Sequence, residues 1–206
     1  MKGKNYKKLA CCAAMLLLVF AGRAFAYDFS AEFVEKDGAE IQKGKIYISG
    51  EMSRYEVDGS EAIQVTRADK KVMWIVFPKH RVYVEEAFAG PVSIGSGTAA
   101  LPKNTGDLSR EDLGFEEVDS YRLRKYLVTV KYNKGETQDK YYEWRRSDFP
   151  VPVKTANLSG TVSYEYKKIK MGPQNPSFFV EPKSYKKVTA EELEKLEAQW
   201  SAKKKK

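Results

Sequence analysis

The sequence has almost no cysteine. Its two cysteines, Cys11 and Cys12, lie within the first 26 residues, so the rest of the chain has no disulfide and no thiolate chemistry. The chain also has a single histidine, His80, which lies in a turn between Lys79 and Arg81. Because zinc sites draw mainly on cysteine and histidine, we expect no metal site and no cofactor. We expect His80 itself to be solvated rather than catalytic.

Long apolar runs are also missing, except at the N-terminus. There, a lysine-rich start precedes an apolar stretch at residues 9–22, and a small-x-small motif follows at residues 24–26. This order is typical of a secretory signal peptide, so we expect cleavage of residues 1–26 and a mature chain that begins near Tyr27. An uncleaved N-terminal anchor is the alternative. The signal peptide predicts a soluble protein of the periplasm.

A basic surplus is absent from the body of the chain. The net charge is +8, but residues 1–26 hold five of the 36 basic side chains and none of the 28 acidic ones, which leaves +3. Lys203–Lys206 supply four of the remaining positive charges, so the body carries −1. A nucleic-acid-binding domain needs a basic face, so no nucleic-acid partner is expected. The lysine tail is either solvated or a contact to an anionic membrane surface.

No set of residues points to catalysis. Residues 95–100 fit the G-x-G-x-x-A fingerprint of dinucleotide sites, but that motif requires a parallel βαβ unit, and Pro102 follows it closely. The adjacent acids at Glu85–Glu86 and Glu116–Glu117 point to opposite faces of a strand, so they do not converge on a substrate. We therefore expect a protein that is not an enzyme.

Most of the sequence after residue 26 has the patterns of β-strands. Residues 29–86 contain short alternating segments separated by turn signals such as Asp37-Gly38 and Asp58-Gly59. Two further hairpins are predicted at residues 121–146 and 151–170. These patterns favour an antiparallel sheet, most of whose strands are apolar on one face only.

The stretch VMWIVFPKHRVYVEE, Val72–Glu86, departs from this alternation because its first six residues are all apolar. A four-residue turn at Pro78–Arg81 predicts a hairpin in which Phe77 pairs with Val82. Both faces of this hairpin need cover, whereas the neighbouring strands are one-sided. A strongly curved sheet with an apolar concavity would provide that cover. The concavity is predicted to be lined by nine side chains: Ile46, Ile48, Ile63, Val65, Met73, Ile75, Phe77, Val82 and Val84.

Residues 87–114 differ from the rest because they are rich in Gly, Pro, Ser and Thr. They predict a long loop that serves as a partial lid, with one helical turn over residues 109–115 that Ser109 would cap. Residues 177–182 predict a last short strand.

The C-terminus contains the one predicted α-helix. Thr189 and Glu192 have the spacing of a capping box at the start of residues 189–202, whose apolar stripe is narrow. We expect this helix to lie against the sheet. Residues 27–188 are thus predicted to form a single curved β domain, followed by the helix and by a lysine tail at residues 203–206.

Three segments carry a resemblance to a known family. They are GKIYISGEMSRYEV at residues 44–57, DKKVMWIVFPKHRVYVEE at residues 69–86 and FFVEPKSYKKV at residues 178–188. In this order, the chain resembles a family of secreted bacterial proteins of unknown function, which is related to the periplasmic lipoprotein carriers and outer-membrane lipoprotein receptors (LolA/LolB-like). The resemblance implies a half-open antiparallel β-barrel of about eleven strands with an apolar concavity. In the better-known members, this concavity binds acyl chains.

The chain departs from the carriers at its start, because they begin with a helix that helps to close the cavity. Here the first strand is predicted within a few residues of the cleavage site, so a lid must come from residues 87–114 or from the C-terminal helix. We expect a monomeric binding protein that holds a lipid or a lipidated protein. The alternative is a protein-interaction or envelope-stress sensing module on the same fold, with a filled core.

Overall fold

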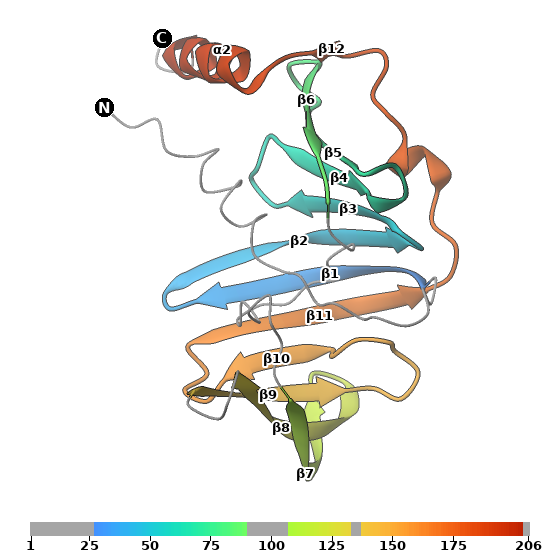
Figure 1. The fold of residues 1–206 in the computed structure, drawn as a ribbon, viewed down its shortest axis with the longest axis vertical. Helices are drawn as coiled ribbons and strands as arrows, with labels where there is room; N and C mark the ends of the chain where they lie inside the picture. Colours follow the sequence, from blue (N-terminus) through green and yellow to red (C-terminus); the bar gives the residue numbers. More distant parts are fainter. Residues whose placement is uncertain (1–26, 90–106, 133–136, 204–206) are drawn as a thin grey trace.

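The chain forms one large sheet with an α-helix near its C-terminus (Figure 1). The structure is a computed structural model that describes residues 27–89, 107–132 and 137–203. The strands within these residues are β1 (Asp28–Asp37), β2 (Glu40–Ser49), β3 (Met52–Val57), β4 (Ile63–Arg67), β5 (Val72–Phe77), β6 (Val82–Ala87), β7 (Leu108–Val118), β8 (Tyr121–Tyr132), β9 (Thr137–Arg145), β10 (Lys154–Asn157), β11 (Val162–Met171) and β12 (Lys186–Lys187). The helices are η1 (Ala68–Lys70), η3 (Pro176–Phe179) and α2 (Ala190–Lys203).

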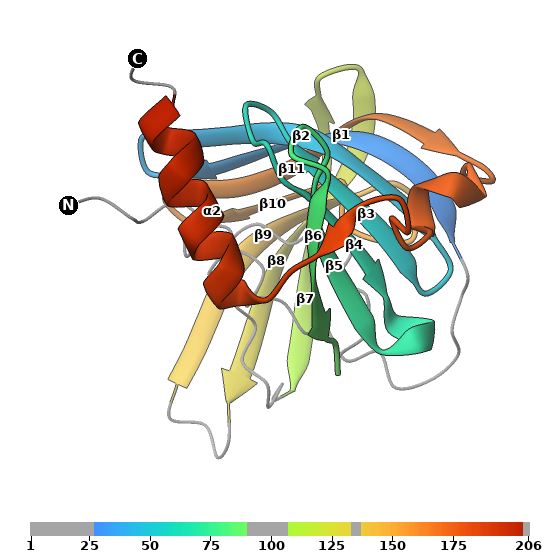
Figure 2. The same ribbon diagram turned by 90° about the horizontal axis from the view of Figure 1, so that it is seen from above.

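The sheet is curved and twisted, and it is not closed into a barrel. Its strand order is β12-β6-β5-β4-β3-β2-β1-β11-β10-β9-β8-β7, and β12 lies parallel to β6 while the other pairs are antiparallel. Figure 1 shows β6 and β7 towards opposite ends of the long axis, and Figure 2 shows the sheet bending over β1, β2 and β11. The predicted fold class is confirmed. Among the described residues the sheet has twelve strands rather than about eleven, because β12, with two residues, adds to the edge of β6.

The central strands have one apolar and one charged face. Phe29 and Phe33 on β1 and Ile46 and Ile48 on β2 are fully buried or nearly so. The register pairs Phe29 with Ile48, and paired residues project to the same side of a sheet. We call this side the apolar face. The opposite side carries Glu32, which pairs with a lysine on β2, and we call it the charged face.

Gly44 on β2 lets Phe33 pack closely against the sheet. A Cβ atom at this position would lie 2.0 Å from the Glu56 carbonyl oxygen and 2.5 Å from the Phe33 ring. A glycine inside a strand often marks such a close approach. The ring of Phe33 therefore occupies the space above residue 44, where other residues would place a side chain.

Most predicted turns of the N-terminal half are confirmed, including the one in the two-faced hairpin. The turn at Pro78–Arg81 joins β5 to β6, and Phe77 pairs with Val82 as expected. Strand breaks also occur at the two Asp-Gly sites, Asp37-Gly38 and Asp58-Gly59. Both glycines have positive φ, the backbone conformation that such tight turns require.

The C-terminal segment covers both faces of the β5–β6 hairpin. We call residues 172–203 the strap. On the apolar face, α2 packs against a cluster that includes Phe77 and Val84. On the opposite face, Tyr185 packs against a second cluster around Trp74. Between these two contacts, β12 pairs with the outer edge of β6. One segment from the end of the chain therefore supplies the cover that the hairpin needs.

Polar contacts fix the strap along its length. The Arg67 guanidinium donates to the Phe179 carbonyl oxygen at 2.8 Å, and the Tyr83 hydroxyl donates to Glu181 at 2.8 Å. Burial, together with the bond to Glu181, raises the pKa of Tyr83 to about 12. The predicted capping box is confirmed at the start of α2, because Thr189 and Glu192 exchange hydrogen bonds of 2.9 and 3.2 Å.

Two predicted local structures are wrong. Residues 109–115 lie in β7 rather than in a helical turn, because the pairing of nine β7 residues with β8 outweighs the local capping pattern. Residues 177–182 do not form a strand, since Pro176–Phe179 is a 3-10 helix. Its cap is Asn175, whose side chain accepts a hydrogen bond from the Ser177 amide.

Several predicted regions fall outside the described residues. These are the signal peptide at residues 1–26, the central part of the loop at residues 90–106, the turn at residues 133–136 and the end of the lysine tail at residues 204–206. No helix in the described part of the chain is long and apolar enough to span a membrane.

Candidate functional site

The nine predicted site residues do not all lie on one surface. Seven share the apolar face, where the register connects Ile46 and Ile48 through β3 and β4 to the β5–β6 hairpin. Ile63 and Val65 lie on the opposite face, in the cluster around Trp74. The prediction that they line the same concavity is therefore wrong. The seven residues that the structure places on one face are Ile46, Ile48, Met73, Ile75, Phe77, Val82 and Val84.

A polar strip divides these seven residues into two groups. Ser53 and Thr66 lie between Ile48 and Met73 in one cross-strand row, and both polar residues are buried. In the next row, Gln64 donates to the Thr66 hydroxyl at 3.4 Å. The apolar face thus has two apolar areas, one over β1, β2 and β11 and the other beneath α2.

The area over β1, β2 and β11 is an aromatic cluster. Its rings are those of Phe29, Phe33, Tyr55, Phe149, Tyr164 and Tyr166. Phe33 stacks on Tyr55 with centroids 4.3 Å apart, and Phe149 packs edge-on against Phe29 at 4.9 Å. Offset and edge-on arrangements of this kind stabilise a core beyond the burial of their area.

Two hydroxyl groups in the aromatic cluster have no hydrogen-bond partner among the described residues. They belong to Tyr164 and Tyr166, whose side chains are 3% and 1% exposed. The two rings pack edge-on with centroids 5.0 Å apart, and each phenol affects the pKa of the other. Burial raises the pKa of both phenols, so each remains a neutral O–H group that can donate. Buried polar atoms without partners are uncommon in folded proteins.

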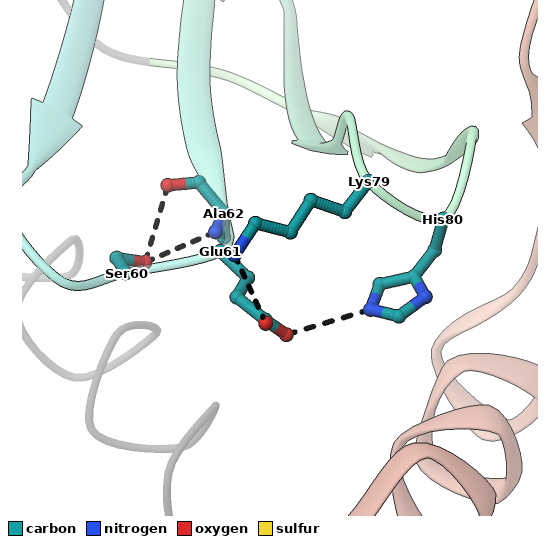
Figure 3. A network of polar contacts seen from close by, with 5 residues as sticks. All are labelled: Ser60, Glu61, Ala62, Lys79 and His80. Carbon is teal, nitrogen blue, oxygen red and sulfur yellow. Dashed lines mark hydrogen bonds and ion pairs between the residues drawn. The ribbon is translucent and has the colours of Figure 1, made fainter. Parts of the chain in front are cut away.

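His80 lies in a different setting from the solvated turn that the sequence predicts. Its ring stacks on Trp200 of α2, with centroids 3.5 Å apart and planes 4° from parallel. Its Nε2 atom is 3.4 Å from a Glu61 carboxylate oxygen, and Lys79 approaches the same carboxylate (Figure 3). The histidine therefore helps to attach α2 to the sheet. Within the described residues, no group of acidic, histidine or cysteine side chains is arranged to hold a metal ion.

No protein-family model matches the chain, and no curated protein matches it. The structure is similar to two solved complexes of MucB with MucA, one of them from Pseudomonas aeruginosa, at 12% and 14% identity and a TM-score of 0.47 for each. Each match covers 80% of this chain but only 59% and 57% of the other chain.

A third similar structure is a DUF1329 family protein from Desulfovibrio piger, at 13% identity and a TM-score of 0.35. That match covers 78% of this chain and 92% of the other. Similarity at these levels assigns neither a family nor a function to the chain.

The far end of the sheet has a second surface that sequence reasoning missed. β7 is the last strand in the sheet order, and no described strand pairs with its outer edge. Leu113 and Phe115 are exposed there, and the Arg122 guanidinium lies 4.6 Å from the centre of the Phe115 ring. The strand has few alternating apolar residues, so it gives no strand signal in the sequence.

Proposed function

We propose that the protein is a non-enzymatic binding protein of the periplasm that holds an acyl chain, carried by a lipid or a lipidated protein. In this proposal, the chain lies against the apolar face, and its polar end lies near Tyr164 and Tyr166. The observation that supports the proposal is the pair of buried phenol hydroxyls without hydrogen-bond partners among the described residues of the aromatic cluster.

Energetic reasoning favours a ligand at this place. A buried donor without an acceptor costs about 1–3 kcal/mol, and the carboxylate or ester oxygens of an acyl group would accept from both phenols. Each methylene that leaves water adds about 0.8 kcal/mol of stabilisation. The oxygens of the ligand would therefore accept hydrogen bonds from the two hydroxyls, and its methylenes would pack against the aromatic rings.

In the same proposal, α2 acts as the closing element. It covers the apolar area next to the polar strip, and a stacked pair of rings attaches it to the sheet. The predicted contribution of residues 87–114 to a lid concerns mainly residues that the structure does not describe.

The test uses the substitutions Tyr164→Phe and Tyr166→Phe, which remove the hydroxyls and keep the rings. Native mass spectrometry before and after organic extraction would detect a bound lipid, and titration with a long-chain fatty acid would measure its affinity. We expect each variant to bind the fatty acid several-fold more weakly and to unfold at the same or a higher temperature, because an unsatisfied group is gone.

The control is Tyr126→Phe, which changes a half-buried tyrosine on β8 that packs against the separate cluster of Val128, Val130 and Tyr141. Its affinity should equal that of the unaltered protein. A bare protein mass with no fatty-acid uptake would contradict the proposal, and so would unchanged affinity in both phenylalanine variants.

A second candidate function is protein binding at β7, and the open strand edge favours it. β7 carries one basic side chain, Arg110, against four acids at Glu111, Asp112, Glu116 and Glu117. An extended partner segment with alternating apolar and basic residues would add a strand there and complement this charge. Fluorescence anisotropy with a lysine-containing peptide and a glutamate-containing counterpart tests this candidate. Binding of the lysine peptide alone, weakened by Leu113→Lys, would support it.

A further inference from the structure

We propose that the charged face has a binding site for a phosphate group, in a pocket at the junction of β1, β2 and β11. The pocket has a volume of about 240 Å³ and lies on the side of the sheet opposite the aromatic cluster. This site is independent of the acyl-chain proposal. Its polar lining consists of Ser30, Glu32, Lys45, Tyr47, Lys168 and Lys170.

A β-bulge builds one side of the pocket. Ser30 pairs with Lys170 and Glu32 pairs with Lys167, so two residues of β11 lie opposite the single residue Ala31. Lys168, within the bulge, has a φ of 50°, a left-handed conformation that residues other than glycine seldom adopt. Bulges redirect side chains, and strained backbone of this kind is concentrated at binding sites.

The charges around the pocket do not balance. Lys168 forms an ion pair with Glu32 at 2.9 Å. Lys45 lies opposite Glu32 and Glu56 in the strand register, but neither Lys45 nor Lys170 forms a direct ion pair among the described residues. The pocket lining thus holds three lysines and one glutamate, an excess of two positive charges beside a space too small for a drug-sized ligand. A dianionic group of a few atoms would neutralise them.

The hydroxyl groups make phosphate the best match. Ser30 and Tyr47 each present an O–H donor at the pocket, and lysine ammonium groups bind phosphate as point charges. The Tyr47 ring is held in place by Phe178 of the strap, whose ring packs against it with centroids 4.7 Å apart. The phosphate has two possible sources: a soluble phosphate compound, or the headgroup of an anionic phospholipid.

The test measures phosphate binding to the full mature chain by the amide NMR shifts of residues 30–32 and 168–170. We expect saturable shifts on addition of inorganic phosphate. The double substitution Lys45→Met and Lys170→Met should weaken binding by about 25-fold, on the basis of about five-fold for each lysine. Lys43→Met is the matched control, because Lys43 lies on the same strand, is exposed and does not line the pocket.

Lys168→Gly provides an independent variant. Glycine adopts the left-handed conformation without strain, so this variant should be at least as stable as the unaltered protein while it binds phosphate about five-fold more weakly. Sedimentation with phosphatidylglycerol vesicles, against phosphatidylcholine vesicles, identifies the source. Vesicle binding that requires Lys45 and Lys170 and is displaced by phosphate would support a lipid headgroup, whereas phosphate binding without vesicle binding would support a soluble compound.

Two results would overturn the proposal. One is the absence of saturable shifts at millimolar phosphate. The other is an equal loss of affinity in Lys43→Met and in the double variant, which would reveal general attraction to a basic surface rather than a site.

Discussion

The two ends of the sheet differ in how their outermost strand is protected from solvent and from pairing with other chains. At the β6 end, both faces of the β5–β6 hairpin are apolar and its outer strand would be open. The strap covers both faces and pairs with the edge through β12. At the β7 end, the outer strand is long, and no described strand pairs with its outer edge. One end is thus protected by a distant part of the chain, and the other relies on its own residues.

Charge and irregular backbone protect the β7 end. A bulge between Asp112 and Phe115 interrupts its register, and Gly114 within it has a φ of 90°. Charged side chains and bulges are common means by which open strand edges avoid aggregation. On β9, which is separated from β7 by β8, the buried Glu143 carboxylate accepts from Arg110 and Arg145 at 2.9 and 3.2 Å. The β7 end is therefore stabilised by ion pairs, and the β6 end mainly by apolar burial.

The largest expected difference between the two ends concerns leucines. Leu193 of α2 is buried against the hairpin, so Leu193→Ala should lower the free energy of unfolding by about 3 kcal/mol. Leu113 of β7 is 44% exposed, and Leu113→Ala should change it by less than about 0.5 kcal/mol. Urea unfolding followed by tryptophan fluorescence measures both values. Equal losses would show that the exposed edge of β7 is as well packed as the strap.

The next effect tests the ion pairs of the β7 end. Glu143→Gln keeps the side-chain shape but removes the charge that Arg110 and Arg145 share, so we expect a loss of about 2 kcal/mol. The matched control is Glu111→Gln on β7, an exposed acid with no ion pair in the described residues, which should change stability by less than about 0.5 kcal/mol. A loss of less than about 0.5 kcal/mol for Glu143→Gln would show that these ion pairs do not stabilise the β7 end.

The contrast between the ends also explains what the sequence predicts well. The β5–β6 hairpin and the capped helix α2 were predicted with the correct register and cap, because their signals are local: a four-residue turn and a Thr-x-x-Glu spacing. β7 was missed because its side chains face solvent on most of its length, so no alternation remains to be detected. Strands that are not half-buried lose the sequence signature of a strand.

The site prediction failed where it depended on non-local geometry. Alternation within β4 correctly places Ile63 and Val65 together, but only the pairing with β5 determines which face of the sheet they occupy. The bulge that shapes the phosphate pocket depends on the β1–β11 register, to which strands far apart in sequence contribute. In contrast, Asn175-Pro176 carries the local signal of a helix start, which would have identified η3.

The smallest expected effect tests how the strap is held at the edge of β6. The Glu85 carboxylate accepts hydrogen bonds from the ammonium group of Lys187 on β12 and from the indole N–H of Trp74. These bonds, that of Lys187 most strongly, hold the pKa of Glu85 below its ordinary value of 4.5. A carboxylate with a lowered pKa stabilises the fold at neutral pH, and this contribution is lost as the pH falls through the folded pKa. Glu85→Gln should therefore lower the stability by less than about 1 kcal/mol at pH 7.

The difference between Glu85→Gln and the unaltered protein should close as the pH falls from about 5 to about 3, which thermal unfolding at several pH values would show. Glu86→Gln is the control, since Glu86 is exposed and no ion pair is formed by it in the described residues. A difference that persists at pH 3 would mean that the amide disturbs packing around Trp74. A difference that closes would mean that an ion pair holds the strap at the edge of β6, although apolar contacts hold it on the two faces of the hairpin. Charge would then contribute to stability at the β6 end as it does at the β7 end.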